Sequence, residues 1–282
     1  MAQSPKIFDH ELIARRLAHR GTGEDFVTRL VLDDLEDRLL IVTRTFERAL
    51  LLAPDASRLP ARGNSRNGSF AFERISTIHG ADRVDPERLS LPRTDYDLIV
   101  SLFDLQLVND VPGYLARIRA SLAPDGLFLA AALGGDSLTE LRQAFLAADA
   151  EVSGGAYARV APFIPLRDAG GLLQRAGFAL PVADVETHVV RYPSPLALMQ
   201  ELKALGAQNP LADRPGRLAT PRLLAAASAA YTAIASDPDG RVRATLEIIW
   251  LSGWAPHESQ QQPLKPGSAK VSLTKVLGNK AG

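Results

Sequence analysis

The sequence predicts an α/β fold built on a sheet with parallel strands, and two observations carry this prediction. Residues 97–133 read as strand, helix and strand: Leu98–Val100 is a short apolar run, 111–122 has helical spacing, and 127–133 is a second buried strand. Short connections between such elements form a βαβ unit with parallel strands. Two amphipathic stretches precede this unit, which supplies helices to pack against the sheet.

The amino-acid composition excludes several kinds of partner and site. The chain has 282 residues, enough for one large domain or two small ones, and its 32 basic and 32 acidic residues balance. A nucleic-acid partner is therefore not expected, because such binders carry a basic excess. The absence of cysteine excludes disulfides, a thiolate nucleophile and cysteine-ligated metals. The five histidines are too scattered for a local metal motif, so no metal is expected.

Targeting signals are not evident in the sequence. No apolar run approaches the roughly 18 residues of a membrane span, so none is expected. The first 20 residues lack a signal-peptide core and contain Asp9 and Glu11, which a transit peptide would avoid. We therefore expect a cytoplasmic protein.

The N-terminal part predicts two helices and a strand. Residues 7–20 have an apolar face and a basic face, which fits a helix at the domain edge, a lid over a cofactor or a contact with a partner. Residues 25–40 repeat apolar side chains at helical spacing, and 49–53 reads as a buried strand. The polar, turn-rich stretch 62–69 is expected to be a loop. Residues 69–79 offer at best short strands.

The C-terminal part predicts a pair of antiparallel strands with helices between them. Residues 182–192 and 241–254 read as strands. Ser-Pro and Thr-Pro pairs at 194–195 and 220–221 have the N-cap and N1 signals of helices. We expect one domain over 1–260, with N-terminal helices in 1–40, a helical insertion at 193–236 and a C-terminal tail at 261–282.

Three segments carry a family resemblance. The run YDLIVS…PGYLARIRASLAPDGLFLAA (96–131) resembles the fourth strand, helix and fifth strand of class I S-adenosylmethionine-dependent methyltransferases. The segments GGDSLTELR (134–142) and HESQ (257–260) resemble one subfamily, which comprises assembly factor 5 of mitochondrial complex I and its bacterial relatives. The chain is also similar to the malonyl-carrier-protein methyltransferases of biotin synthesis. The resemblance implies a Rossmann-like methyltransferase sheet with helices on both faces, a terminal antiparallel pair and a helical insertion.

The resemblance also implies S-adenosylmethionine as cofactor. A methyltransferase places a glycine-rich turn after its first strand, so that the backbone can approach the cofactor. Here Ala53-Pro54-Asp55-Ala56 contains no glycine. We expect any cofactor site to use Ala53 and Asp55, together with Asp82 and Ser101 after two neighbouring strands.

Catalytic candidates follow from the same resemblance. They are Asp136 in the GGDSLTELR segment, Tyr157 and Arg159 in a loop that covers the active-site mouth in relatives, and His257 as an acid or base. Each also has an ordinary structural interpretation. Ser137 to Glu140 has the spacing of a helix capping box, residues 154–163 fit an ordered surface loop, and His257 fits a structural hydrogen-bonding role.

Three functions are compatible with these patterns. The first is a methyltransferase that acts on a small acid or a carrier-bound substrate. The second, implied by the closer resemblance, is a protein that acts on or binds a subunit of respiratory complex I, with arginine modification in relatives. The third is a non-enzymatic assembly or binding module that has lost the cofactor.

Overall fold

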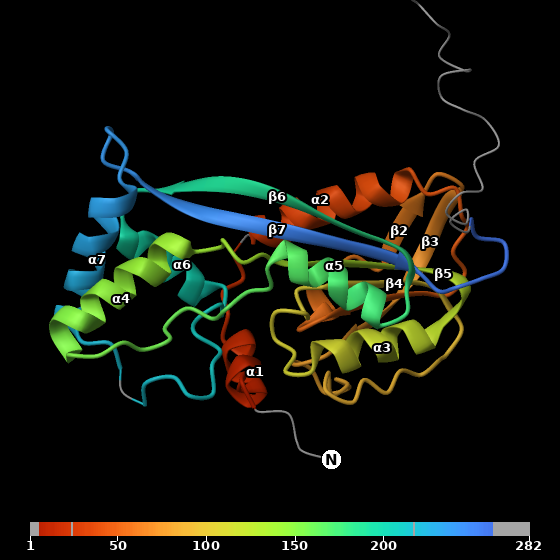
Figure 1. The fold of residues 1–282 in the computed structure, drawn as a ribbon, viewed down its shortest axis with the longest axis horizontal. Helices are drawn as coiled ribbons and strands as arrows, with labels where there is room; N and C mark the ends of the chain where they lie inside the picture. The colour runs from red at the N-terminus through yellow and green to blue at the C-terminus, as the bar shows by residue number, and fades with distance from the viewer. Residues whose placement is uncertain (1–5, 24, 217, 262–282) are drawn as a thin grey trace, which may run out of the picture.

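A mixed seven-stranded sheet is the centre of the molecule (Figure 1). The computed structural model describes residues 6–23, 25–216 and 218–261. Within these residues the strands lie in the order β2-β3-β1-β4-β5-β7-β6. Strands β3, β1, β4 and β5 are parallel, whereas β2, β7 and β6 run antiparallel to their neighbours. The strands are β1 (Ala49–Ala53), β2 (Arg62–Ser65), β3 (Gly68–Ser76), β4 (Tyr96–Leu102), β5 (Leu122–Leu133), β6 (Ala179–Tyr192) and β7 (Val242–Trp254).

Helices cover both faces of this sheet, as predicted. On one face α3 (Val111–Ser121) and α5 (Leu166–Arg175) pack on alternate side chains of the central strands. On the other face α2 (Phe26–Leu40) buries Val31, Leu35 and Leu39 against the remaining side chains of the same strands. Because both faces are covered, β1 is buried at every position, which explains its continuous apolar sequence. The predicted class I methyltransferase fold is confirmed.

The strands β6 and β7 extend beyond the central sheet as an antiparallel arm. In Figure 1 the arm reaches to the left, where α4 (Thr139–Ser153), α6 (Pro195–Ala204) and α7 (Pro221–Ala235) lie beneath it. The buried hydroxyl of Tyr231 on α7 donates to the carbonyl oxygen of Arg243 on β7 at 2.8 Å. The prediction that two helices are inserted between a terminal antiparallel pair is confirmed.

The edge of the sheet beside β1 differs from the prediction. The segment predicted as a loop, 62–69, instead forms β2 and the turn into β3. Gly68 has φ +133°, which suits glycine, and Phe70 and Phe72 of β3 pack on Phe46 and on each other. The burial of these phenylalanine side chains thus stabilises the hairpin despite the polar sequence of 62–69. The connection from β3 to β4 contains no helix or strand, so one βα unit is trimmed.

Helix α1 (His10–Ala18) is attached to the helical insertion. Asp9 caps it by accepting from the Leu12 amide at 3.1 Å. Phe8 forms a bridge with Leu211, and the Gly21 amide donates to the Ala204 carbonyl at 2.8 Å. Both ends of the helix are therefore tied to residues 204–212.

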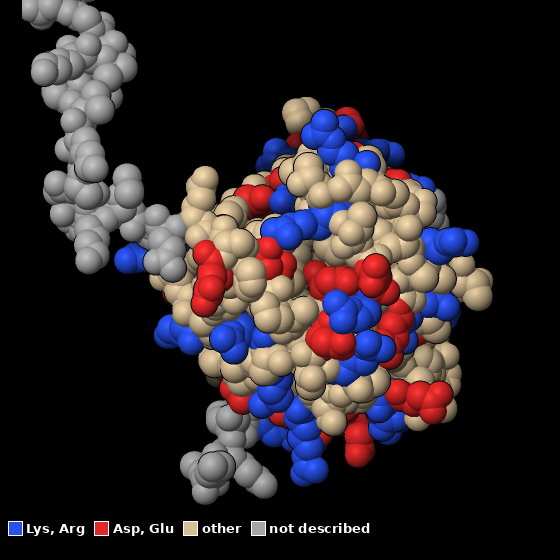
Figure 2. Space-filling view, turned by 90° about the vertical axis from the view of Figure 1, so that its right-hand side faces the viewer, with Lys and Arg blue, Asp and Glu red and all other residues tan. Residues whose placement is uncertain are grey.

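The surface charges are mixed. Figure 2 shows positive and negative side chains intermingled on the face at the right of Figure 1, in keeping with the balanced composition. In the part of the chain that the structure describes, no helix is long and apolar enough to cross a membrane. Of the predicted C-terminal tail, residues 262–282 lie outside the described residues.

Candidate functional site

A cavity of about 1450 Å³ opens at the carboxyl ends of β1, β4 and β5. Ala53 of β1, Phe103 after β4 and Leu133 of β5 line it. In open α/β sheets ligands bind beyond the carboxyl ends of the strands. The cavity therefore occupies the position at which this fold places its chemistry.

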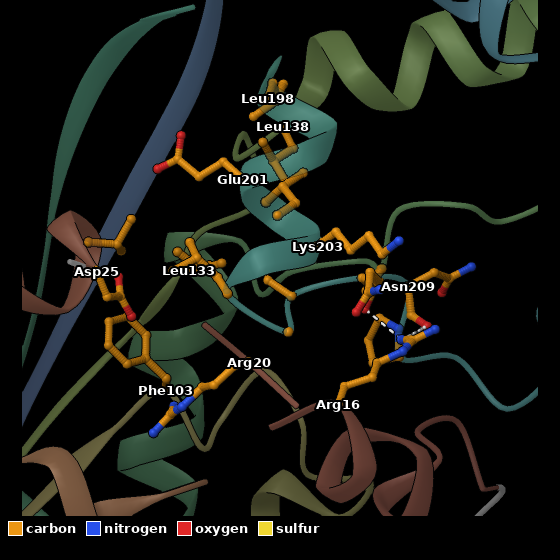
Figure 3. A pocket seen from close by; sticks show the side chains of 18 of the residues that line it. Arg16, Arg20, Asp25, Phe103, Leu133, Leu138, Leu198, Glu201, Lys203 and Asn209 are labelled. Carbon is orange, nitrogen blue, oxygen red and sulfur yellow. Dashed lines mark hydrogen bonds between the residues drawn. The ribbon is translucent and has the colours of Figure 1, made fainter. Parts of the chain in front are cut away.

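Helix α1 closes one side of the cavity. Ile13, Arg16, Leu17 and Arg20 line the cavity and follow the spacing of one helical face. Figure 3 shows Arg16 and Arg20 entering the same space from this side. The Arg16 Nη1 atom donates to the carbonyls of Gln208 and Asn209 at 2.9 and 2.6 Å, which adds to the ties between α1 and the insertion. Of the interpretations left open for this segment, the position of α1 favours a lid.

The turn after β1 is closed by its own hydrogen bonds. The Ala56 amide donates to Ser76 Oγ at 3.0 Å, and the Ser57 amide donates to Asp55 Oδ1 at 3.0 Å. The Arg20 Nη2 atom lies 2.6 Å from the other oxygen of Asp55. Burial alone would raise the pKa of Asp55, but the bonds from Ser57 and the charge of Arg20 lower it below its usual value.

These residues do not fit S-adenosylmethionine in the way that a glycine-rich turn would hold it. Pro54 has no amide hydrogen, and the amides of Ala56 and Ser57 are already bonded within the protein. The strand beside β1 ends at Ser76, and the residues that follow, 77–79, include no carboxylate for ribose hydroxyls. We therefore derive no chemical step through this cofactor.

A buried polar cluster lies at the end of β4. Asp104 is 1% exposed and accepts hydrogen bonds from the hydroxyls of Thr77, Ser101 and Tyr114 at 2.5, 3.0 and 3.2 Å. Burial raises the pKa of Asp104 to about 6, although the three hydrogen bonds oppose the shift. Ser101, the predicted cofactor residue, is thus fully buried in this cluster and does not line the cavity.

Glu201 is the cavity carboxylate of the insertion. It projects from α6 into the space beside Leu138 and Leu198, and Lys203 leaves the same helix in the opposite direction (Figure 3). The hydroxyl of Tyr192 is the group that interacts with its carboxylate. Burial, and secondly the Glu201 charge, raise the pKa of that hydroxyl. Within the described residues Glu201 has no ion-pair partner, unlike Asp55.

Arg159 lines the cavity but is engaged behind it. Its Nε and Nη2 atoms lie 2.6 and 2.7 Å from the two oxygens of Asp149, a carboxylate that is 0% exposed. Its guanidinium also lies 5.6 Å from the ring centre of Tyr157, which is 38% exposed and does not line the cavity. The pair Arg159–Asp149 therefore has a structural role in positioning this loop.

The GGDSLTELR segment leads from β5 into α4 and forms hydrogen bonds with β7. Ser137 does not cap α4: its hydroxyl donates to the Glu247 carbonyl at 3.0 Å, and Glu140 accepts from the amide of Thr245 at 3.1 Å. The predicted capping box is therefore wrong, because β7 takes both side chains and Leu138, with φ 54°, precedes the helix. Asp136 is exposed outside the cavity, and its amide donates to Glu247 Oε2 at 2.8 Å.

Two predicted site residues lie away from the cavity. Asp82 lines a separate hollow of about 450 Å³ outside β3. His257 follows β7, which ends beside the beginning of β5, so it lies at the sheet edge opposite the cavity. There its Nδ1 atom and the Ser259 hydroxyl are 2.7 Å apart. Of the predicted site residues, the structure brings Ala53, Asp55 and Arg159 to the cavity.

Sequence reasoning missed Glu201, Arg20 and Asp104 as functional residues. Glu201 is an isolated acid on a helix, and Arg20 is one of several arginines on an amphipathic helix. Asp104 follows a buried strand at the carboxyl edge, and this position is the signal that could have identified it.

Comparison with known proteins places the chain in a family. No family model matches it. It is 38% identical over 261 residues to the mitochondrial arginine hydroxylase NDUFAF5 of Danio rerio, covering 88% of this chain and 81% of that protein. The human NDUFAF5 is 40% identical over 189 residues, 67% of this chain, but the match covers only 54% of the human protein.

A second group of relatives carries a different name. The malonyl-[acyl-carrier protein] O-methyltransferase of Xylella fastidiosa is 30% identical over 253 residues, covering 89% of this chain and 82% of that protein. Among solved structures, the YcgJ protein of Bacillus subtilis overlaps with a TM-score of 0.47 at 12% identity, covering 81% of this chain and 99% of that chain. The chain therefore belongs to the S-adenosylmethionine-dependent methyltransferase-like family that includes NDUFAF5 and the malonyl-[acyl-carrier protein] O-methyltransferases.

Proposed function

We propose that this chain acts on or binds a subunit of respiratory complex I, and that its cavity receives an arginine side chain of that subunit. Kinship with proteins named arginine hydroxylases supports the substrate class. The protein would work in the cytoplasm, which cell fractionation tests.

Glu201 carries the proposal. A carboxylate in an apolar cavity is costly unless a cation or hydrogen-bond donors compensate it. Two other charged groups of the cavity, Arg20 and Arg159, are already engaged by Asp55 and Asp149. Glu201 has only the Tyr192 hydroxyl, so it is free to accept a guanidinium through a bidentate pair.

The experiment is a pull-down of complex I subunits with the tagged full-length chain, followed by titration with arginine peptides from the captured subunit. Glu201→Gln should weaken binding about 10- to 100-fold, since a hydrogen bond to a charged group is worth about 1.5–3 kcal/mol. Glu151→Gln is the control, because Glu151 is an exposed carboxylate that does not line the cavity. Capture of no complex I subunit contradicts the partner, and equal binding by Glu201→Gln contradicts the arginine site.

A second candidate function is a binding module that has lost the cofactor. The closed turn after β1 favours it. Calorimetric titration with S-adenosylmethionine and S-adenosylhomocysteine decides between the two: micromolar binding supports an enzyme, and no binding supports the module. Glycine at Pro54 and Ala56 should not strengthen binding, because Ser76 and Arg20 still close the turn. A tenfold gain would show that the side chains alone block the site.

A further inference from the structure

Strand β6 leaves one of its edges without a partner in the described part of the chain. It is fourteen residues long, stands last in the sheet order and pairs only with β7. In Figure 1 it runs along the upper border of the molecule over the arm. A long edge strand with free N–H and C=O groups is a template for pairing with another chain.

The outer part of β6 is also unusually apolar for an exposed strand. Val182, Val185 and Val189 are 55%, 36% and 58% exposed. Val185 and Val189 lie on the same face because side chains alternate along a strand. Between them stands Thr187, which is also exposed. An unpaired edge strand with solvent-facing valines favours association, because no further strand of the described chain pairs with the edge.

The sequence of β6 is complementary to itself. When two copies run antiparallel with a two-fold axis at Thr187, Val185 of each copy faces Val189 of the other. Glu186 of each then faces His188 of the other. Cross-strand apolar pairs stabilise sheets, and the Glu186 carboxylate can accept a hydrogen bond from the His188 imidazole.

Neighbouring registers lack this match. An axis at Val185 places Asp184 opposite Glu186, and an axis at Glu186 places the two Glu186 carboxylates opposite each other. Like charges directly opposite destabilise a strand pair. The axis at Thr187 therefore combines both favourable pairs with no like-charge pair among them.

His188 adds a polar reason for this pairing. Its Nε2 atom is buried and lacks a hydrogen-bond partner, although Glu186 Oε2 of the same strand lies 3.4 Å away in unsuitable geometry. A buried nitrogen without a partner destabilises the chain. In this register the Glu186 carboxylate of a second copy lies opposite His188 and accepts the missing bond.

We propose that two copies of this chain associate through β6, antiparallel about Thr187, and so join their two sheets into one. The match between the side chains of β6 and those of an antiparallel copy identifies a second copy of the chain as the partner of this edge. A strand from another protein is the competing occupant, and the test separates the two.

The chain contains no cysteine, so single cysteines report the register directly. Facing residues in antiparallel strands have Cα atoms about 4.5–5.5 Å apart, within the range of a disulfide. Thr187→Cys should therefore form a covalent dimer on oxidation. Val189→Cys alone should not, because its own copy lies four residues away along the strand, about 13 Å. A mixture of Val185→Cys and Val189→Cys should form the covalent heterodimer.

Sedimentation of the full chain tests the association without a crosslink. We expect a dimer at about 100 μM, a concentration well above the Kd of a typical stable interface. Val189→Asp should raise the dissociation constant at least tenfold, whereas Ile234→Asp should not. Ile234 is a matched control, because it is 47% exposed on α7. A monomeric wild-type protein overturns the proposal, and it is the result expected if the edge of β6 serves a strand from another protein. Crosslinking of Val189→Cys alone as readily as Thr187→Cys also overturns it.

Discussion

Replacement of Asp104 by asparagine should change how stability depends on pH. Asp104 is buried, and its pKa is raised from 3.8 to about 6. A carboxyl with a raised pKa contributes most stability below its unfolded pKa, and that contribution is lost as pH rises through the folded value. The loss spans about pH 4 to 6 and amounts to about 3 kcal/mol, from 1.36 kcal/mol for each pKa unit.

The assay is urea unfolding of the wild type and Asp104→Asn at several pH values between 4 and 7.5. Lost hydrogen bonds to Thr77, Ser101 and Tyr114 give the variant a constant penalty. As pH rises, the wild type should lose about 3 kcal/mol of unfolding free energy relative to the variant. Glu151→Gln, which removes an exposed carboxylate outside this cluster, is the control. A flat curve for Asp104→Asn, or one of opposite slope, would refute a buried carboxyl with a raised pKa.

Two further substitutions test the joints around the cavity. Arg159→Ala should lower the unfolding free energy by about 3–5 kcal/mol, because Asp149 would remain buried without its cation. Urea unfolding measures this loss, and a value under about 1 kcal/mol would contradict the structural role of the pair. Gly134→Ala should cost about 1–3 kcal/mol, since an added Cβ would lie 2.6 Å from the Glu247 carboxyl carbon. Gly155→Ala, which has no atom within 4 Å of an added Cβ, should leave the melting temperature unchanged, and equal effects of the two would contradict the contact.

The fold could be predicted because most of its helices and strands carry their own sequence signals. The continuous apolar run of β1 and the Ser-Pro start of α6 each report a single element, and both lie where the sequence predicts them. The hairpin of β2 and β3 was missed because its stability comes from phenylalanine contacts with Phe46, distant in sequence. Such a contact overrides a polar, turn-rich stretch.

The candidate site was less predictable because its groups meet only through tertiary structure. Ser137 and Glu140 have the spacing of a capping box, yet they bind β7, more than a hundred residues away. His257 stands close to the end of a long strand, and the direction of that strand alone decides at which edge of the sheet it lies. Residue type and spacing give the chemistry of a side chain, but not its partner.

The ion pair of Arg20 with Asp55 links the lid of the cavity to its floor. Arg20 follows α1, which the insertion holds at both ends, and Asp55 follows β1. A ligand that used the β1 turn would have to displace both this pair and the bonds to Ser57 and Ser76. Entry beside α6 displaces none of these bonds, and it leads to Glu201, a carboxylate without an ion-pair partner among the described residues. The closed turn therefore leaves the side of the cavity next to the insertion as the more open route for the proposed partner.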